Sequence, residues 1–171
     1  MEMSDRLSKL ATFYHREARK CSRARAYFSA SVMQVAALEA ALQSMCFVFA
    51  TDIRKTNIYQ RKRFRRKRSK ALEFSLHELI AIAEELSWFP AKRISWGGKR
   101  ATLGGFAHEI RKLRNFVHSG VWAREQDGTT KFTKRVYDVV FEVYDVAISW
   151  LIHRVHQNLK KRMDQEERKG A

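Results

Sequence analysis

The segment AYFSASVMQVAALEAALQSMCFVF, residues 26–49, decides the fold of this chain. Its apolar residues recur at spacings of three and four, which is the period of an α-helix. They form one broad face that is rich in alanine, made of Ala30, Met33, Ala37, Leu38, Ala41, Leu42 and Met45. Because small side chains allow other helices to pack closely, we predict that residues 26–49 form the central helix of a bundle.

A second segment carries the clearest helix start in the sequence. Ser75 and Glu78 make an S-x-x-E capping box, in which each residue can bond the backbone of the other. Phe74 and Leu79 have the spacing of the accompanying hydrophobic staple. A helix is therefore expected to start at this box and to run to about residue 88.

Three more segments have helical periodicity. Apolar residues repeat at three and four over residues 5–25, 103–117 and about 133–162. No stretch alternates as a useful β-strand would, and the proline and paired glycines of residues 90–100 are typical of a connecting loop. The sequence predicts an all-α fold, an antiparallel bundle of about five helices, forming a single domain over residues 1–171.

The positive charge of the chain is concentrated in one segment. Lys and Arg number 34 against 18 Asp and Glu, which gives a formal net charge of +16. Residues 54–70 hold ten of these basic residues and no acidic one, so the remainder carries only +6 (16 minus 10). The densest part of this basic insertion contains Arg61, Lys62, Arg63, Arg65, Arg66, Lys67 and Arg68.

RNA or another polyanion is the expected partner of the basic insertion. An acidic lipid or protein, a nuclear localisation signal and a solvated spacer are alternative interpretations.

The two cysteines lie in helical segments without metal-site spacing, and the most apolar stretch is interrupted by polar residues. We therefore expect a cytoplasmic protein with no disulfide, metal, cofactor or membrane span.

A polar stripe accompanies the apolar face of the helix predicted over 103–117. Arg111, Arg114, Asn115 and His118 are spaced by three, four and seven residues, which places their side chains on one side of the helix. An imidazole can move protons near neutral pH, and guanidinium groups can bind phosphate oxygens. This combination favours phosphoryl transfer without a metal ion. In the alternative, structural interpretation, His118 ends the helix before Gly120 and interacts with the helix dipole.

The run IRKLRNFVHSG, residues 110–120, is similar to the signature of the HEPN superfamily, in which an arginine precedes a histidine by a few residues. Arg111 and His118 have six residues between them, which fits that signature, while Arg114 lies closer and is the other position for the family arginine. Residues 26–42 and 74–90 also resemble segments of bacterial members, in the same order.

The resemblance implies a helical bundle that forms a homodimer, with two Arg/His motifs lining one cleft. In active members it implies metal-independent cleavage of RNA, with His118 as acid or base, Arg111 stabilising the phosphate, Asn115 as the polar motif residue and Arg114 as a phosphate contact. It also implies a toxin or phage-defence role, in which an acidic antitoxin-type protein would be a partner. Other HEPN members are non-catalytic, so the alternative is a dimeric module that binds nucleic acid or protein.

Overall fold

The structure of the protein is a computed structural model, which describes residues 2–60, 74–96, 98–115 and 132–170. Its elements, in chain order, are α1 (Met3–Arg23), α2 (Tyr27–Val48), α3 (Ala50–Ile53), α4 (Asn57–Gln60), α6 (Leu76–Glu85), β1 (Ile94–Trp96), β2 (Lys99–Ala101), α7 (Leu103–Asn115) and α9 (Lys134–Gly170). Helix dominates the described residues, which confirms the prediction of an all-α bundle.

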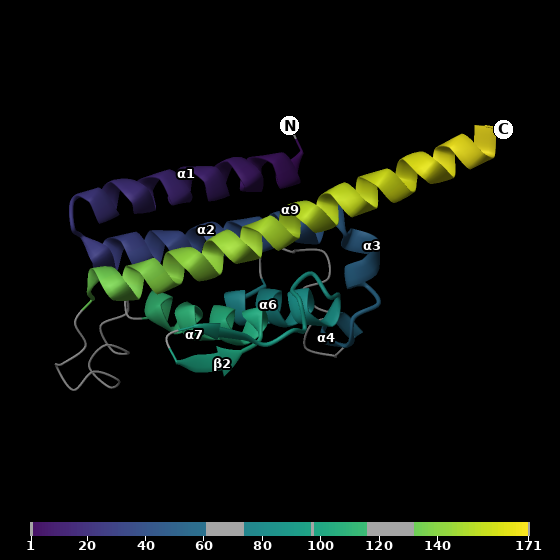
Figure 1. Cartoon of the computed structure of the whole chain (residues 1–171). Coiled ribbons are helices and arrows are strands. Elements are labelled where there is room, and N and C mark those ends of the chain that lie inside the picture. The colour runs from purple at the N-terminus through teal and green to yellow at the C-terminus, as the bar shows by residue number, and fades with distance from the viewer. Residues whose placement is uncertain (1, 61–73, 97, 116–131, 171) are drawn as a thin grey trace.

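Helix α2 is the centre of the bundle, as its sequence predicts. It packs against α1, α6, α7 and α9, and Figure 1 shows α1 on one side of α2 and α9, with α6 and α7 on the other. Buried side chains point from α2 in all these directions; those with no exposure include Ala30, Val35, Ala37, Leu38 and Leu42. Burying a leucine stabilises a fold by about 1.5–3 kcal/mol, so this helix accounts for much of the core.

The same helix is also long and apolar enough to cross a membrane. It has 22 residues, and its most apolar window has a mean hydropathy of 1.4. In this structure 56% of that window is buried inside the protein. The pattern therefore matches the core helix of a bundle, which passes the same test of length and composition.

The long helices do not all alternate in direction. Helix α1 runs antiparallel to α2, and the backbone turns between them at Arg25, which adopts a left-handed φ of 59°. By contrast, α9 runs in the same direction as α2, because Phe28 in the first turn of α2 contacts Phe132 just before α9, with ring centroids 4.7 Å apart. The end of α2 at Val48 and the middle of α9 around Ile152 both line a pocket with Ser4 and Asp5 at the beginning of α1.

Helix α6 begins with the predicted capping box. The Glu78 backbone N–H donates to Ser75 Oγ at 3.4 Å, and the Ser75 backbone N–H donates to Glu78 Oε2 at 2.8 Å. The helix ends at Glu85, three residues before the expected end at about residue 88. It stops there because Ser87 has a left-handed φ of 54°, which turns the buried Trp88 back towards the core.

The loop predicted over residues 90–100 is a small antiparallel hairpin instead. Strand β1 pairs with β2 so that Ile94 lies opposite Ala101, and Trp96 lies opposite Lys99. Gly98 provides the positive φ of 79° in the turn. Each strand has three residues, which is too short for an alternating pattern to be recognised in the sequence.

Helix α9 is longer than predicted, with 37 residues ending at Gly170 rather than near 162. At 1.5 Å per residue it is about 55 Å long, and its last part projects beyond the other helices (Figure 1).

Within the basic insertion, Asn57–Gln60 form α4. The cluster from Arg61 to Arg68 lies outside the described residues.

Candidate functional site

The predicted Arg/His stripe is only partly described. Arg111 lies on α7 and is half-buried. Arg114 and Asn115 belong to the last turn of α7, but their side chains are outside the described part, as is His118 altogether. The convergence of these four side chains therefore remains a prediction from the spacing.

Helix α7 presents its apolar face to the core and a polar edge to α6. The predicted core residues Leu103, Phe106 and Ile110 are all buried. On the polar edge, His108 and Arg111 are three residues apart and therefore share one side of the helix. His108 faces two residues of α6, His77 and Glu84, which are themselves seven residues, or about two turns, apart.

The four side chains form what we call the α6–α7 patch: His77, Glu84, His108 and Arg111. The imidazoles of His77 and His108 have centroids 4.9 Å apart at an interplanar angle of 46°. His108 Nε2 lies 3.7 Å from Glu84 Oε2. Gly104 makes this approach possible, because a Cβ at that position would collide with the Glu84 carboxylate.

Burial and neighbouring charges shift the protonation of the α6–α7 patch. Burial lowers the pKa of His108 below its ordinary value, and His77 and Arg111 lower it further. Burial raises the pKa of Glu84, although His77 and a hydrogen bond with Thr102 act in the opposite direction. His108 is therefore predominantly neutral at neutral pH, with one ring nitrogen available as a proton acceptor.

Two buried polar atoms of the patch have no hydrogen-bond partner among the described residues, namely His108 Nδ1 and Arg111 Nε. Leaving such a group unpaired costs about 1–3 kcal/mol, and more for a charged one. An oxyanion beside Arg111 would supply the missing acceptor, since a guanidinium group binds phosphate or carboxylate oxygens with several parallel donors. The patch thus combines a guanidinium group, which can bind an oxyanion, with an imidazole, which can accept a proton.

Sequence reasoning identified Arg111 but missed His77, Glu84 and His108. The spacing of three between His108 and Arg111 was a signal that could have joined them. The contribution of α6 had no comparable signal, because it depends on how α6 and α7 pack.

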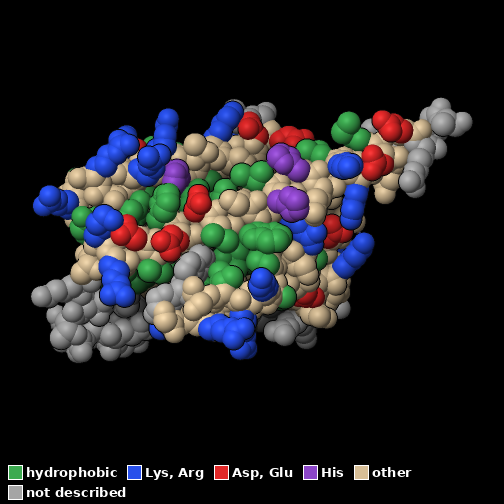
Figure 2. Space-filling view, viewed as in Figure 1, with side chains coloured by type: hydrophobic (Ala, Val, Ile, Leu, Met, Phe, Trp, Pro, Cys, Tyr) green, Lys and Arg blue, Asp and Glu red, His purple; other side chains and the backbone are tan. Residues whose placement is uncertain are grey.

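A second polar surface lies on α1. Exposed cations follow the solvent side of this helix, and we call them the α1 basic face: Arg6, Lys9, Arg16, Lys20 and Arg23. Figure 2 shows Lys and Arg side chains along the upper edge of the molecule, where Figure 1 places α1. Phe13 is exposed among them and lines a shallow hollow with Lys9 and Arg16. Lys9 and Lys20 also form ion pairs with Asp5 and Glu17, at 3.1 and 2.7 Å.

No group of three or more His, Cys, Asp or Glu in the described ranges could hold a metal ion. Comparisons of the chain with protein-family models, curated proteins and solved structures give no match.

We expect NMR titration to give His108 a pKa below about 6.5, the value of an unperturbed histidine. Arg111→Gln should raise this pKa, because it removes a nearby positive charge, whereas Lys92→Gln, in an exposed loop outside the patch, should leave it unchanged. The charges of Glu109 and Lys112 also shift the pKa of His108, and both residues are unchanged in the two variants.

The lowered pKa of His108 also fixes the sign of its effect on stability. Folding favours the neutral imidazole, so this contribution is present above about pH 6.5 and is lost as the pH falls through the folded-state pKa. Unfolding by urea should then depend less on pH over this range in His108→Gln than in the wild type. A His108 pKa at or above 6.5 would contradict the proposed environment of the ring.

Proposed function

We propose that this protein is a cytoplasmic RNA-binding bundle that cleaves RNA without a metal ion, through Arg111 together with His108 or His118. The observation that carries the proposal is the buried Nε of Arg111, which has no acceptor among the described residues. The Arg111 charge acts on His108, whose ring lies 4.9 Å from that of His77. A backbone phosphate would supply that acceptor, and an imidazole beside it could take the proton of the attacking group.

The reaction that fits these groups is transesterification within the RNA strand. The ribose 2′-oxygen loses its proton to a base and forms a bond to the adjacent phosphorus, while the bond to the 5′-oxygen breaks and that oxygen receives a proton from an acid. The products are a 2′,3′-cyclic phosphate and a free 5′-hydroxyl. Arg111 would stabilise the charge that develops on the phosphoryl oxygens.

Two imidazoles are candidates for the proton transfers. The resemblance to HEPN proteins assigns this role to His118, with Asn115 orienting the ring or the phosphate and Arg114 as a further phosphate contact. His108 adds a second candidate, since it is neutral at neutral pH and lies beside Arg111. Glu84, at 3.7 Å from His108 Nε2, would orient and stabilise the ring after it accepts a proton.

Purified protein in EDTA should cleave single-stranded RNA to fragments with cyclic phosphate ends, which mass spectrometry identifies. His118→Ala should lower the rate by about 10²–10⁴-fold, the usual contribution of a positioned acid or base, and Arg111→Ala should cause a comparable loss. His108→Ala has the same expected loss if that ring is the second member of the acid–base pair, and a smaller one if it only positions Arg111.

His153→Ala is the matched control, because His153 is an exposed imidazole on α9, outside the α6–α7 patch. It should retain full activity. Cleavage that His118→Ala and Arg111→Ala both leave unchanged would identify a contaminating nuclease or another site, and cleavage that EDTA abolishes would show a metal-dependent reaction.

A second candidate function is a non-catalytic module that binds RNA or an acidic protein. The α1 basic face favours it, because five cations and the exposed ring of Phe13 lie on one continuous helix surface. Lysine and arginine rows bind phosphates without chemistry, and aromatic rings stack on unpaired bases. This function requires no histidine.

Binding of single-stranded RNA should weaken steeply with salt, since each phosphate contact contributes about 0.7 to the slope of log K against log salt. Replacing Arg6, Arg16 and Lys20 by Gln should reduce the slope, and replacing the cations of residues 61–68 by Gln should reduce it further. The matched control is Lys134→Gln with Arg135→Gln, at the start of α9. If neither set of replacements changes the slope, these surfaces do not bind the phosphates.

A further inference from the structure

A pocket of about 250 Å³ is lined by residues of α3, of the chain just after α6, and of α9. We call it the α3–α9 pocket. Its floor is apolar, because Trp88 and Phe49 are only 2% and 8% exposed and their ring centroids are 5.5 Å apart. Its rim carries the cations Lys55, Arg154 and Lys161. Pockets for drug-sized ligands usually measure about 300–1,000 Å³, so this one fits a small ligand or the end of a larger one.

Arg154 is held at this pocket by neutral acceptors. Its Nε donates to the Ser87 carbonyl oxygen at 3.1 Å, and its Nη2 donates to the Leu86 carbonyl oxygen at 3.4 Å. Its Nη1 donates to Gln157 Oε1 at 3.0 Å. A guanidinium group has five N–H donors, so two remain, and none of the three acceptors neutralises the charge. Arg154 is therefore a positioned cation with donors left for an anion.

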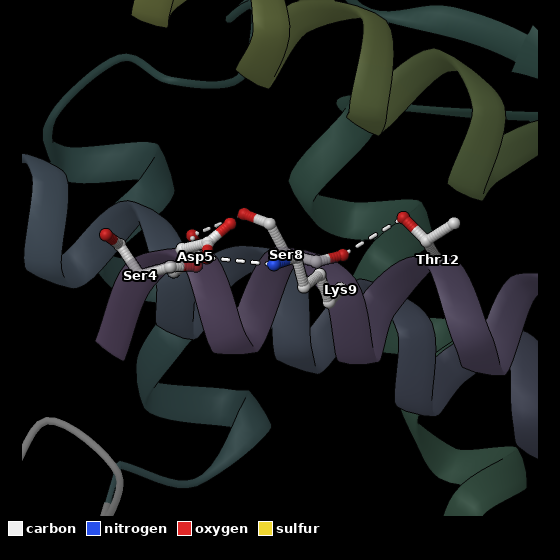
Figure 3. Close-up of polar contacts among 6 residues, drawn as sticks. Ser4, Asp5, Ser8, Lys9 and Thr12 are labelled. Atoms are coloured by element: carbon white, nitrogen blue, oxygen red, sulfur yellow. Dashed lines mark hydrogen bonds and ion pairs between the residues drawn. The ribbon is translucent and has the colours of Figure 1, made fainter. Parts of the chain in front are cut away.

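Two further donors lie on the same side of α9. Asn158 and Lys161 follow Arg154 at spacings of four and seven residues, and all three line the pocket. Neither Asn158 nor Lys161 has a hydrogen bond or an ion pair with the other described residues. Lys9 on α1 shows the more usual arrangement of a surface cation, since its Nζ donates to Asp5 Oδ2 at 3.1 Å (Figure 3). The Asn158 amide and the Lys161 ammonium are therefore available to a ligand.

The lining of the pocket has an excess of positive charge. Its net charge is +2 (3 minus 1), from Lys55, Arg154 and Lys161 against Asp52. Asp52 Oδ1 lies 3.8 Å from Lys55 Nζ, and the two side chains are 47% and 75% exposed, so this ion pair is weak. Figure 2 shows Lys and Arg side chains in the region where Figure 1 places α3 beside α9. A ligand with two negative charges would balance the lining.

We propose that the α3–α9 pocket binds a phosphate monoester. Such a group carries a charge of about −1.5 to −2 at pH 7 and has three strong acceptor oxygens. Its charge matches the net charge of the lining, and its oxygens match the donors of Arg154, Asn158 and Lys161. A carboxylate or a phosphodiester has a single negative charge, so the lining favours the monoester over the RNA backbone. The apolar floor keeps water from one side of the anion, which strengthens the attraction.

The α3–α9 pocket is separate from the α6–α7 patch. Glu84 belongs to the patch and Leu86 to the pocket. Two residues correspond to about 200° around a helix, so these side chains point to different sides of α6. The cleavage proposed above also leaves a 5′-hydroxyl and a cyclic phosphate, which is a diester. Its products therefore carry no monoester, and each proposal can fail without the other.

Calorimetric titration of the full chain with 5′-AMP, 3′,5′-cyclic AMP and adenosine tests the requirement for a monoester. The three ligands share a base and have a monoester, a diester and no phosphate. We expect 5′-AMP to bind at least about tenfold more tightly than cyclic AMP, because it brings a second charge to the pocket. Adenosine should show no binding. Equal affinities for the three ligands would overturn the proposal, because the base would then carry the binding.

Lys161→Gln should weaken the binding of 5′-AMP by about tenfold or more, which is the loss expected for one charge-assisted hydrogen bond. Lys160→Gln is the matched control, because it removes the same charge from the adjacent residue of α9, which does not line the pocket. Arg154→Gln should cause a larger loss, and circular dichroism checks that this variant still folds. An unchanged affinity in the exposed Lys161→Gln variant would contradict the proposal by itself.

NMR locates the bound phosphate. At a concentration that saturates the calorimetric site, 5′-AMP should shift the side-chain amide signals of Asn158. Shifts at His77 and His108 without a shift at Asn158 would place the phosphate at the α6–α7 patch and overturn the proposal.

The source of the monoester is identified with a single-stranded DNA that ends in a 5′-phosphate, compared with the same strand ending in a hydroxyl. If the phosphate increases the affinity of the strand by at least about tenfold and shifts the Asn158 signals, the pocket takes the end of a nucleic-acid strand. If it changes neither while 5′-AMP binds, the pocket takes a free phosphorylated small molecule. If neither 5′-AMP nor the phosphorylated strand shifts Asn158, the pocket does not bind a phosphate monoester.

Discussion

The fold depends on the close packing of other helices around α2. Among the described elements, α1, α3, α6, α7 and α9 contact it, and its small residues, such as Ala30, Ala37 and Ala40, are buried. Its buried polar residues are positioned for specific contacts. Ser31 Oγ donates to the Tyr27 carbonyl oxygen at 2.8 Å, and Gln34 Nε2 lies 3.1 Å from His15 Nδ1 on α1. This contact satisfies one end of the Gln34 amide and links α1 to α2, whereas the buried Gln34 Oε1 has no partner among the described residues.

The packing of helices around α2 shapes two surfaces of the molecule. On one side, α2 supplies the floor of a groove between α1 and α9. On the other side, it supports α6 and α7, whose apolar faces turn inward and whose polar edges meet each other. A change in the packing of α2 would therefore alter the groove and the α6–α7 patch together.

Sequence reasoning predicted the parts of the fold that local signals determine. The periodicity of α2 and the capping box of α6 each lie within one segment, so they could be recognised without knowledge of the rest of the chain. The common direction of α2 and α9 and the β1–β2 hairpin were missed, because they depend on contacts between segments or on very short strands. The end of α9 was underestimated because its last turns are polar and lack a core-facing pattern.

The candidate site shows the same limit. Arg111 was selected from a motif on one helix, whereas His77 and Glu84 join it only because α6 packs against α7. The motif predicted phosphate chemistry at this helix, and the packing adds an imidazole of lowered pKa and two buried atoms that have no partner among the described residues. These features convert a pattern of residue types into a site with a defined local environment.

The most direct test of this account is an NMR titration of His108 in the presence of a single-stranded oligonucleotide that lacks the 2′-hydroxyl and so cannot be cleaved. If the α6–α7 patch binds a backbone phosphate, the oligonucleotide should shift the His108 resonance and raise its pKa, because an anion stabilises the imidazolium form. Arg111→Gln should remove this effect. A His108 titration that saturating oligonucleotide leaves unchanged would contradict the assignment of this patch as the phosphate-binding centre.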